Sequence, residues 1–207
     1  IYTVDLSKEL LDKGASKTQD DWSVYSQQAQ LQSDFHAADL TFYHALFTEL
    51  YKNKDNHAIK ATVEEARSFL EKTFLAEWLM TLTRVQYNPK GKDIIVHNHH
   101  MPDEYQIEET IVGPDGYITK PETKAQSALT ALLECNQDIN EVNNIYKWIT
   151  QKDAYLWRVN SKPIQVDERV AGFGADSGRT NLFCGRYPWD SGSACGVRFA
   201  RSARTKN

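Results

Sequence analysis

Cysteine is scarce in this chain of 207 residues, which contains Cys135, Cys184 and Cys195 and no others. Three cysteines do not make a disulfide framework, and their separations match no zinc-binding spacing. One interpretation is that Cys184 and Cys195 form a disulfide bridge. The other interpretation is that both are free cysteines, which behave as ordinary small apolar side chains. The cysteines therefore do not define the redox compartment.

Long hydrophobic runs are also missing from the sequence. The longest apolar stretch lies at residues 74–80 and is interrupted by Glu77. A helix that crosses a bilayer needs about 18 or more consecutive apolar residues. We therefore expect no insertion into a membrane.

The sequence also has no strong excess of one charge, because it contains 24 Lys and Arg residues and 28 Asp and Glu residues. With 41% hydrophobic residues, the composition is that of a globular chain with a packed core. The C-terminal end is locally basic through Arg198, Arg201, Arg204 and Lys206. These spread cations come without a recognition helix or a stacking platform, so we expect no nucleic-acid partner.

The common signatures of nucleophilic and dinucleotide-binding enzymes are missing too. The chain has no Gly-x-Ser-x-Gly, and Gly172-Phe173-Gly174 is a lone Gly-x-Gly that no helical pattern follows. A nucleophile needs an exposing turn and a base, and a dinucleotide loop needs a helix after its glycines. We therefore predict neither an enzyme nor a cofactor.

Hydrophobic periodicity predicts the elements of the chain. Apolar residues recur at helical spacing in residues 40–51 and 63–70, with a turn between them at residues 53–56. From residue 78 the period becomes two, which is typical of a strand. Further helices are expected at Leu6 to Lys13, Gln19 to Gln32, 125–133 and 139–149. Strands are expected at 78–85, 94–97, 105–112 (closed by a turn at 113–116), 155–159, 169–173, 182–186 and 196–200.

This order of elements predicts an α+β fold, with helices in the N-terminal part and a C-terminal antiparallel β region. No internal repeat or low-complexity linker divides the chain. We therefore expect a single domain over residues 1–207.

Three histidines stand close together at His97, His99 and His100, with Asp103 and Glu104 close behind. Imidazoles and carboxylates are ligands of zinc, nickel and iron. On a strand, His97 and His99 would share a face, yet no third ligand is evident from the sequence. The alternative is a polar strand end that leads into a loop, and we favour it, so no metal ligand is predicted.

The C-terminal segment has an unusual composition. Residues 169–200 contain no Lys, Glu, Gln, Met, His or Ile, whereas Gly, Ser, Asp, Arg, Asn, Thr, Cys, Tyr and Phe are frequent. Antibody paratopes favour similar residues, because rigid aromatics and small polar groups give adaptable contacts. Phe183, Tyr187 and Trp189 would be the anchors of such a surface. The alternative is a glycine-rich β region whose aromatic side chains are buried.

The segment Arg169 to Arg201, RVAGFGADSGRTNLFCGRYPWDSGSACGVRFAR, resembles the end of the C-type lectin fold of the formylglycine-generating-enzyme kind. Residues 196–201 carry most of this likeness. The segment looks still more like the variable region of proteins diversified by retroelements, of the archaeal or archaeal-virus type. Randomised adenines in AAC or AAT codons yield the observed palette, and Trp189 is the exception.

The resemblance implies a fixed scaffold whose exposed side chains vary. We therefore expect a non-enzymatic protein that recognises different ligands, protein or glycan, on a cell surface, in receptor binding or adhesion at a virion or cell surface. Arg186, Gly196, Val197 and Arg198 would be scaffold. The candidate ligand-binding residues, within the variable segment 169–201, are Phe173, Asp176, Gly178, Thr180, Phe183, Cys184, Gly185, Tyr187, Trp189, Asp190, Ser191, Ser193 and Cys195.

The same resemblance leaves an enzymatic alternative. The formylglycine-generating oxidase binds copper through paired cysteines, and Cys184 and Cys195 are the nearby candidates here, although their surroundings do not resemble that motif. A metal-dependent enzyme at His97, His99 and His100 is the other form of this alternative. The calcium site of lectins is expected to be missing, since Trp189-Asp190 is only a fragment of its signature. The sequence does not give the oligomeric state.

Overall fold

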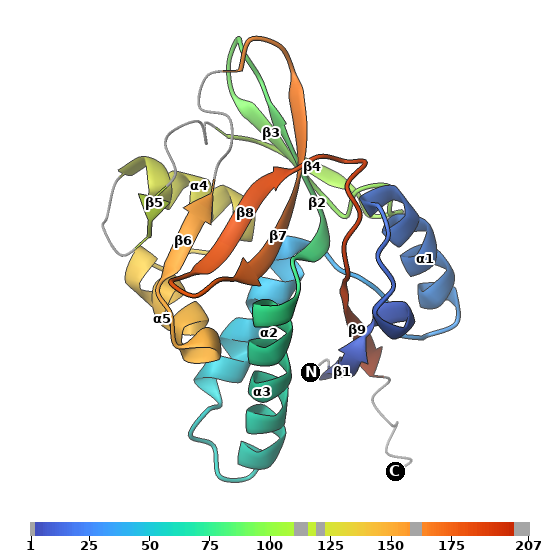
Figure 1. Cartoon of the computed structure of the whole chain (residues 1–207), viewed down its shortest axis with the longest axis vertical. Helices are drawn as coiled ribbons and strands as arrows, with labels where there is room; N and C mark the ends of the chain where they lie inside the picture. The colour runs from blue at the N-terminus through green and yellow to red at the C-terminus, as the bar shows by residue number, and fades with distance from the viewer. Residues whose placement is uncertain (1–2, 110–115, 119–122, 158–162, 201–207) are drawn as a thin grey trace, which may run out of the picture.

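The computed structural model describes residues 3–109, 116–118, 123–157 and 163–200 (Figure 1). In this part of the chain the fold is α+β, with five α-helices and a mostly antiparallel sheet, which confirms the predicted class. The elements in chain order are β1 (Thr3–Leu10), the 3-10 helix η1 (Leu11–Gly14), α1 (Gln19–Leu31), α2 (Leu40–Lys52), α3 (Lys60–Ala76), β2 (Leu79–Tyr87), β3 (Asp93–His97), β4 (Tyr105–Glu109), β5 (Gly116–Tyr117), α4 (Thr123–Leu133), α5 (Ile139–Thr150), β6 (Ala154–Trp157), β7 (Asp167–Ala175), β8 (Thr180–Arg186) and β9 (Cys195–Ala200).

The main sheet has seven strands in the order β4-β3-β2-β7-β8-β6-β5. Neighbouring strands are antiparallel except β6 and β8, which run parallel. A separate two-stranded sheet pairs β1 with β9, so that Val4 lies opposite Phe199. Segments far apart in the sequence are therefore joined at two places, β2 with β7 and β1 with β9.

Alternation along β2 places helices on both faces of the sheet. Val85 and Tyr87 point to the main core, which α2, α3, α4 and α5 cover, and we call this the helical face. Met80 and Leu82 point to the opposite side, the outer face, where they pack against Trp22 of α1. Helix α1 therefore covers one part of the outer face, beside β2 (Figure 1).

The predicted helix at Leu6 to Lys13 is wrong. Residues 3–10 form strand β1, and a 3-10 turn follows at residues 11–14. The leucines of this segment occur at spacings that suit a helix, yet β9 offers a strand edge for pairing. Because that partner lies nearly the whole chain away, local periodicity could not reveal it.

The other predicted elements are found close to their expected positions. Helices α1 to α5 and strands β2, β3 and β6 to β9 all overlap the predicted ranges. Strand β4 ends at Glu109, and the rest of the predicted strand to residue 112, with most of the turn at 113–116, lies outside the described residues, as do residues 158–159. Among the described helices, none is both long and apolar enough to span a membrane.

Candidate functional site

An open part of the outer face lies over β6, β7 and β8, beyond the reach of α1. Trp157 of β6 and Phe183 of β8 are register partners, so their side chains stand next to each other on this face. Trp78, which precedes β2, completes the group, with ring centroids 5.0 Å from Phe183 and 6.2 Å from Trp157. Both ring pairs meet edge to face, a favourable geometry for aromatic side chains.

These aromatic side chains surround a cavity of about 270 Å³, lined by Trp78, Trp157, Phe183, Gly185 and Arg186. Three of the five lining residues belong to the segment 169–201. We call this space the aromatic cavity. Its walls are largely apolar rings, with one guanidinium group at the side.

Two glycines of β7 make room for these rings. A Cβ atom at Gly172 would overlap the carbonyl oxygen of Leu79 and lie 2.6 Å from the Phe183 ring. A Cβ atom at Gly174 would lie 3.2 Å from the Trp78 ring. The bare backbone of β7 is therefore the floor on which Trp78 and Phe183 rest.

The aromatic surface continues from Trp157 toward the sheet edge. Tyr155 lies two residues before Trp157 and therefore on the same face. The Arg179 guanidinium sits 4.0 Å from the Tyr155 ring centre and 5.9 Å from that of Trp157. Tyr117 of β5 meets Tyr155 edge to face at 5.0 Å. Cationic and aromatic groups are thus interleaved along this side of the cavity.

On the side of Arg186, the loop between β8 and β9 presents a second aromatic group. Tyr187 and Trp189 stack with ring centroids 4.6 Å apart, and they are 41% and 70% exposed. The Arg169 guanidinium lies 3.8 Å from the Tyr187 ring centre. Asp190 closes the turn, because its side chain accepts a hydrogen bond from the Tyr187 amide at 2.9 Å. The two rings are therefore held in place while they face solvent.

The predicted ligand-binding residues divide sharply by burial. Four are exposed and three are partly exposed, so their side chains or backbone can meet a ligand. The other six are buried, and of these only Phe183 lines the aromatic cavity. The exposed set is Gly178, Tyr187, Trp189 and Ser191, the partly exposed set is Asp176, Gly185 and Asp190, and the buried set is Phe173, Thr180, Phe183, Cys184, Ser193 and Cys195.

Phe173 and Thr180 show why burial removes part of the prediction. Phe173 points to the helical face, where its ring stacks on Phe74 of α3 at a centroid distance of 5.6 Å. The hydroxyl group of Thr180 forms a hydrogen bond with the hydroxyl group of Thr150 at the end of α5. These side chains hold the sheet to its helices, and their burial leaves them inaccessible to an external ligand.

Asp176 acts inside the turn between β7 and β8. Its carboxylate accepts hydrogen bonds from the Gly178 amide at 2.8 Å, the Arg179 amide at 3.0 Å and the Asn181 side chain at 3.2 Å. The pKa of Asp176 is lowered although partial burial, its largest single influence, acts to raise it, because these donors together favour the charged form. Asp176 therefore fixes the hairpin that carries Arg179.

Two of the three cysteines, Cys184 and Cys195, lie in the interior, and Cys135 is partly buried. Cys184 and Cys195 belong to the main core, and Cys135, Cys184 and Cys195 all carry thiols rather than disulfides. Burial raises the pKa of Cys195 to about 12, so its thiol stays protonated near neutral pH. The bridge between Cys184 and Cys195 is not formed, and this setting does not favour cysteine chemistry.

Three cavity residues were not among the predicted binding residues. Trp78 and Trp157 lie before the segment 169–201 in the sequence, and Arg186 was assigned to the scaffold. The alternation of Tyr155 and Trp157 with the buried Ala154 and Leu156 was the available signal, since it puts two aromatic rings on one face of a strand. The contribution of Trp78 depends on the pairing of β2 with β7, which the local pattern does not show.

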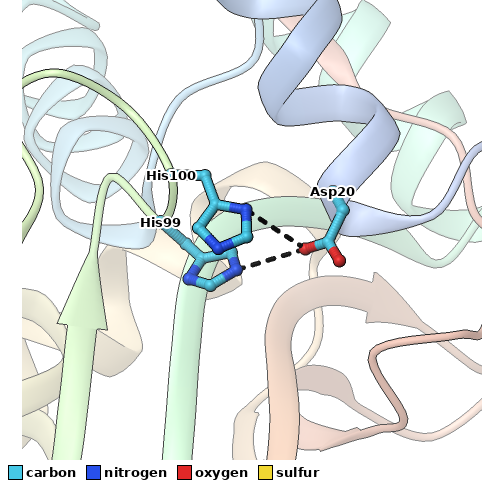
Figure 2. A group of neighbouring side chains, drawn as sticks. All are labelled: Asp20, His99 and His100. Atoms are coloured by element: carbon cyan, nitrogen blue, oxygen red, sulfur yellow. Dashed lines mark hydrogen bonds and ion pairs between the residues drawn. The ribbon is translucent and has the colours of Figure 1, made fainter.

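The histidines separate into two groups. His97 is buried on the helical face, with Nδ1 3.0 Å from the Thr83 hydroxyl, and burial lowers its pKa. His99 and His100 instead meet Asp20 of α1 on the outer face (Figure 2). Burial and the nearby charges of Arg84 and His100 lower the pKa of His99 to about 4, so it is neutral at pH 7. Strand β3 ends at His97, so His97 and His99 do not share a face as they would on a continued strand.

Comparison of the chain with protein-family models, with curated proteins and with solved structures gives no match.

Proposed function

We propose that this chain is a non-enzymatic ligand-binding protein whose segment 169–201 is diversified to recognise different protein or glycan ligands on a cell surface. The role would be receptor binding or adhesion, at a virion or cell surface. The observation that carries the proposal is the aromatic cavity, together with the exposed Tyr187 and Trp189 that follow it.

The size of the cavity favours one anchoring group of a larger ligand. Pockets that enclose a whole small molecule usually measure about 300–1,000 Å³, whereas this one measures about 270 Å³. A single ring or side chain would fill it, and the flanking aromatics would contact the rest of the ligand. Such an arrangement, a filled central pocket with aromatic and arginine neighbours, is typical of binding hot spots.

The division between scaffold and exposed residues also supports the proposal. Gly196 and Val197, which the resemblance assigns to the scaffold, are buried, and Arg198 pairs with Asp5 of β1 at 3.0 Å. Tyr187 and Trp189 project from the loop without entering the core. Changes at the exposed positions would therefore alter the surface at little cost to folding. On this basis we propose that the α+β fold is C-type-lectin-like.

Binding to defined probes tests the proposal. We expect the wild-type chain to select members of an oligosaccharide array or of a displayed random-peptide library. Trp157→Ala, which opens one wall of the cavity, and the double variant Tyr187→Ala/Trp189→Ala should each weaken binding to the selected probes by about tenfold or more. Their melting temperatures should stay within a few degrees of the wild type.

Leu31→Ala is the matched control, because Leu31 is an 89% exposed apolar side chain at the end of α1. This control should bind the selected probes as the wild type does. Equal binding by all variants would show that the probes use another surface, and the proposal would then be wrong.

Diversification has its own test at the source locus. We expect a near-copy of the segment encoding Arg169 to Arg201, with differences confined to template adenines, beside a reverse-transcriptase gene. A locus without such a copy would remove the diversification part of the proposal and leave ligand binding to be judged by the probe experiment.

A further inference from the structure

A second cluster of side chains lies where α1 meets the turn after β3. Asp20 comes from the first turn of α1, and His99 and His100 come from the segment between β3 and β4 (Figure 2). The nearest Asp20 carboxylate oxygen is 3.2 Å from Nε2 of His99 and 3.7 Å from Nδ1 of His100. One ligand atom from each of the three residues lies within 4.8 Å of the others.

These separations suit one metal ion. Zinc bonds to histidine nitrogen and carboxylate oxygen at about 2.0–2.2 Å, so two ligand atoms at a tetrahedral centre lie about 3.4 Å apart. The two distances to the Asp20 oxygen, 3.2 Å and 3.7 Å, lie on either side of that value. We propose that Asp20, His99 and His100 bind one divalent transition-metal ion, with zinc as the fitting example.

The charges around the cluster also favour a dication. Glu104 lies 3.7 Å from Nδ1 of His99, the ring nitrogen turned away from Asp20. Arg84 bridges Asp20 at 2.9 Å and Glu168 at 3.2 Å. Three carboxylates, those of Asp20, Glu104 and Glu168, therefore surround one guanidinium, and a dication would balance this excess of carboxylates.

Two of these neighbours would act on the ligands rather than on the ion. A carboxylate beside the second nitrogen of a histidine ligand orients the ring and increases its basicity, and Glu104 has that position toward His99. Arg84 holds the Asp20 carboxylate and is itself balanced by Glu168 and by the Gln19 side chain, whose oxygen accepts at 2.9 Å. These partners orient two of the three proposed ligands before an ion arrives.

The backbone of the turn is docked on α1 in the same way. The Ser23 hydroxyl donates to the His99 carbonyl at 2.7 Å, and the Gln27 amide donates to the His100 carbonyl. Asp20, Ser23 and Gln27 share one face of α1, because they are three and four residues apart. Asn98 and His100 have φ values of 52° and 60°, and these left-handed residues let consecutive imidazole rings stack at 3.8 Å. The cluster is thus preorganised.

The ion would link the first turn of α1 to the turn between β3 and β4. The His100 and Asp20 side chains are 57% and 54% exposed, so a fourth coordination position would be open to water. This inference does not depend on the proposed ligand-binding function, because the aromatic cavity lies on the other part of the outer face.

Zinc titration of the untagged, chelator-stripped chain tests the inference. Calorimetry should show one bound zinc per chain, and zinc should raise the melting temperature, because the ion binds the folded state. His100→Ala removes an exposed ligand and should weaken zinc binding by more than about a hundredfold. Glu104→Gln keeps an acceptor for the His100 amide and should weaken it by about 10- to 100-fold. Calcium should not bind, since it prefers oxygen ligands.

His57→Ala is the control, because His57 is an exposed histidine on the loop between α2 and α3. It should bind zinc as the wild type does. Melting temperatures measured in chelator show whether each variant folds. Asp20→Asn loses the ion pair with Arg84. If that variant does not fold, His100→Ala still provides the test. No stoichiometric binding by the wild type, or equal binding by His100→Ala, would overturn the inference.

Discussion

At the level of single residues, the outer face depends on where side chains are missing. Gly172 and Gly174 leave the backbone of β7 bare, and the Phe183 and Trp78 rings occupy the space that Cβ atoms would take. The helical face of the same strand carries Phe173, which is fully packed. The Gly-Phe-Gly motif at residues 172–174 does not form a dinucleotide-binding loop. It is part of a strand that carries no side chain on its outer face and the packed Phe173 on its helical face.

Gly172→Ala should destabilise the fold by about 1–3 kcal/mol, because the new methyl group overlaps the Leu79 carbonyl and crowds Phe183. Gly178→Ala is the matched control, since the nearest atom to its Cβ would be 3.7 Å away. Urea unfolding of both variants measures the difference. Equal stabilities would mean that β7 can shift away from β2 without cost.

At the scale of elements, helix α1 both supplies Asp20 and packs against the loop between β8 and β9. Its Trp22 is buried against Met80 and Leu82, and the indole nitrogen donates to the Gly192 carbonyl at 2.7 Å. The backbone of Gly192 also pairs with that of Lys17, just before the helix. Helix α1 therefore fixes the base of the loop that carries Tyr187 and Trp189.

Trp22→Ala should cost about 3–5 kcal/mol, because it leaves a large cavity and removes the hydrogen bond to Gly192. Trp189→Ala removes the same side-chain type from an exposed position and should change stability by less than about 0.5 kcal/mol. Thermal or urea unfolding compares them. A small loss for Trp22→Ala would indicate that α1 is not needed to hold the loop.

The elements also show what the sequence could and could not predict. Helix α5 was predicted because Ile139, Val142 and Ile145 share one face, a property of the local chain. Strand β1 was missed because its hydrogen-bond partner is β9. In the site, composition indicated Tyr187 and Trp189 as candidate anchors and left open whether they are buried, whereas the approach of Asp20 to His99 depends on how α1 packs on the sheet. Local periodicity carries no information of that kind.

Across the folded chain, buried histidines link stability to pH. Burial lowers the pKa of His36, and burial likewise lowers that of His44, which lies between the Tyr146 hydroxyl and the Gln137 side chain. In the unfolded chain both histidines take up protons near pH 6.5. The stabilising contribution is therefore complete above pH 6.5 and is lost as the pH falls below it, since the unfolded state then binds more protons.

We expect the free energy of unfolding to fall between pH 7.5 and pH 5.5, by up to about 1.4 kcal/mol per pH unit for each such histidine. Burial raises the pKa of Asp39 above 3.8, and this opposes the loss of stability at lower pH. The unfolding free energies of the wild type and the variant are therefore compared near pH 6.5. Urea titrations at several pH values measure this dependence for the wild type and for His44→Gln. The free energy of unfolding of the variant should fall less steeply with decreasing pH. A stability that rises on acidification through this range would contradict the expectation.

The pairing of β1 with β9 has a consequence for synthesis on the ribosome. Val4 lies opposite Phe199, and at about 5–20 residues per second the later strand emerges on the order of 10–40 s after the earlier one. For much of that interval β2 has been made and β7 has not, and helices α2 and α3 are made before any strand of the seven-stranded sheet. Residues 169–200 are thus the last part of the described fold to be translated. A substitution in these residues that blocks the pairing of β7 with β2 would leave β2 unpaired in the nascent chain and accessible to chaperones and proteases.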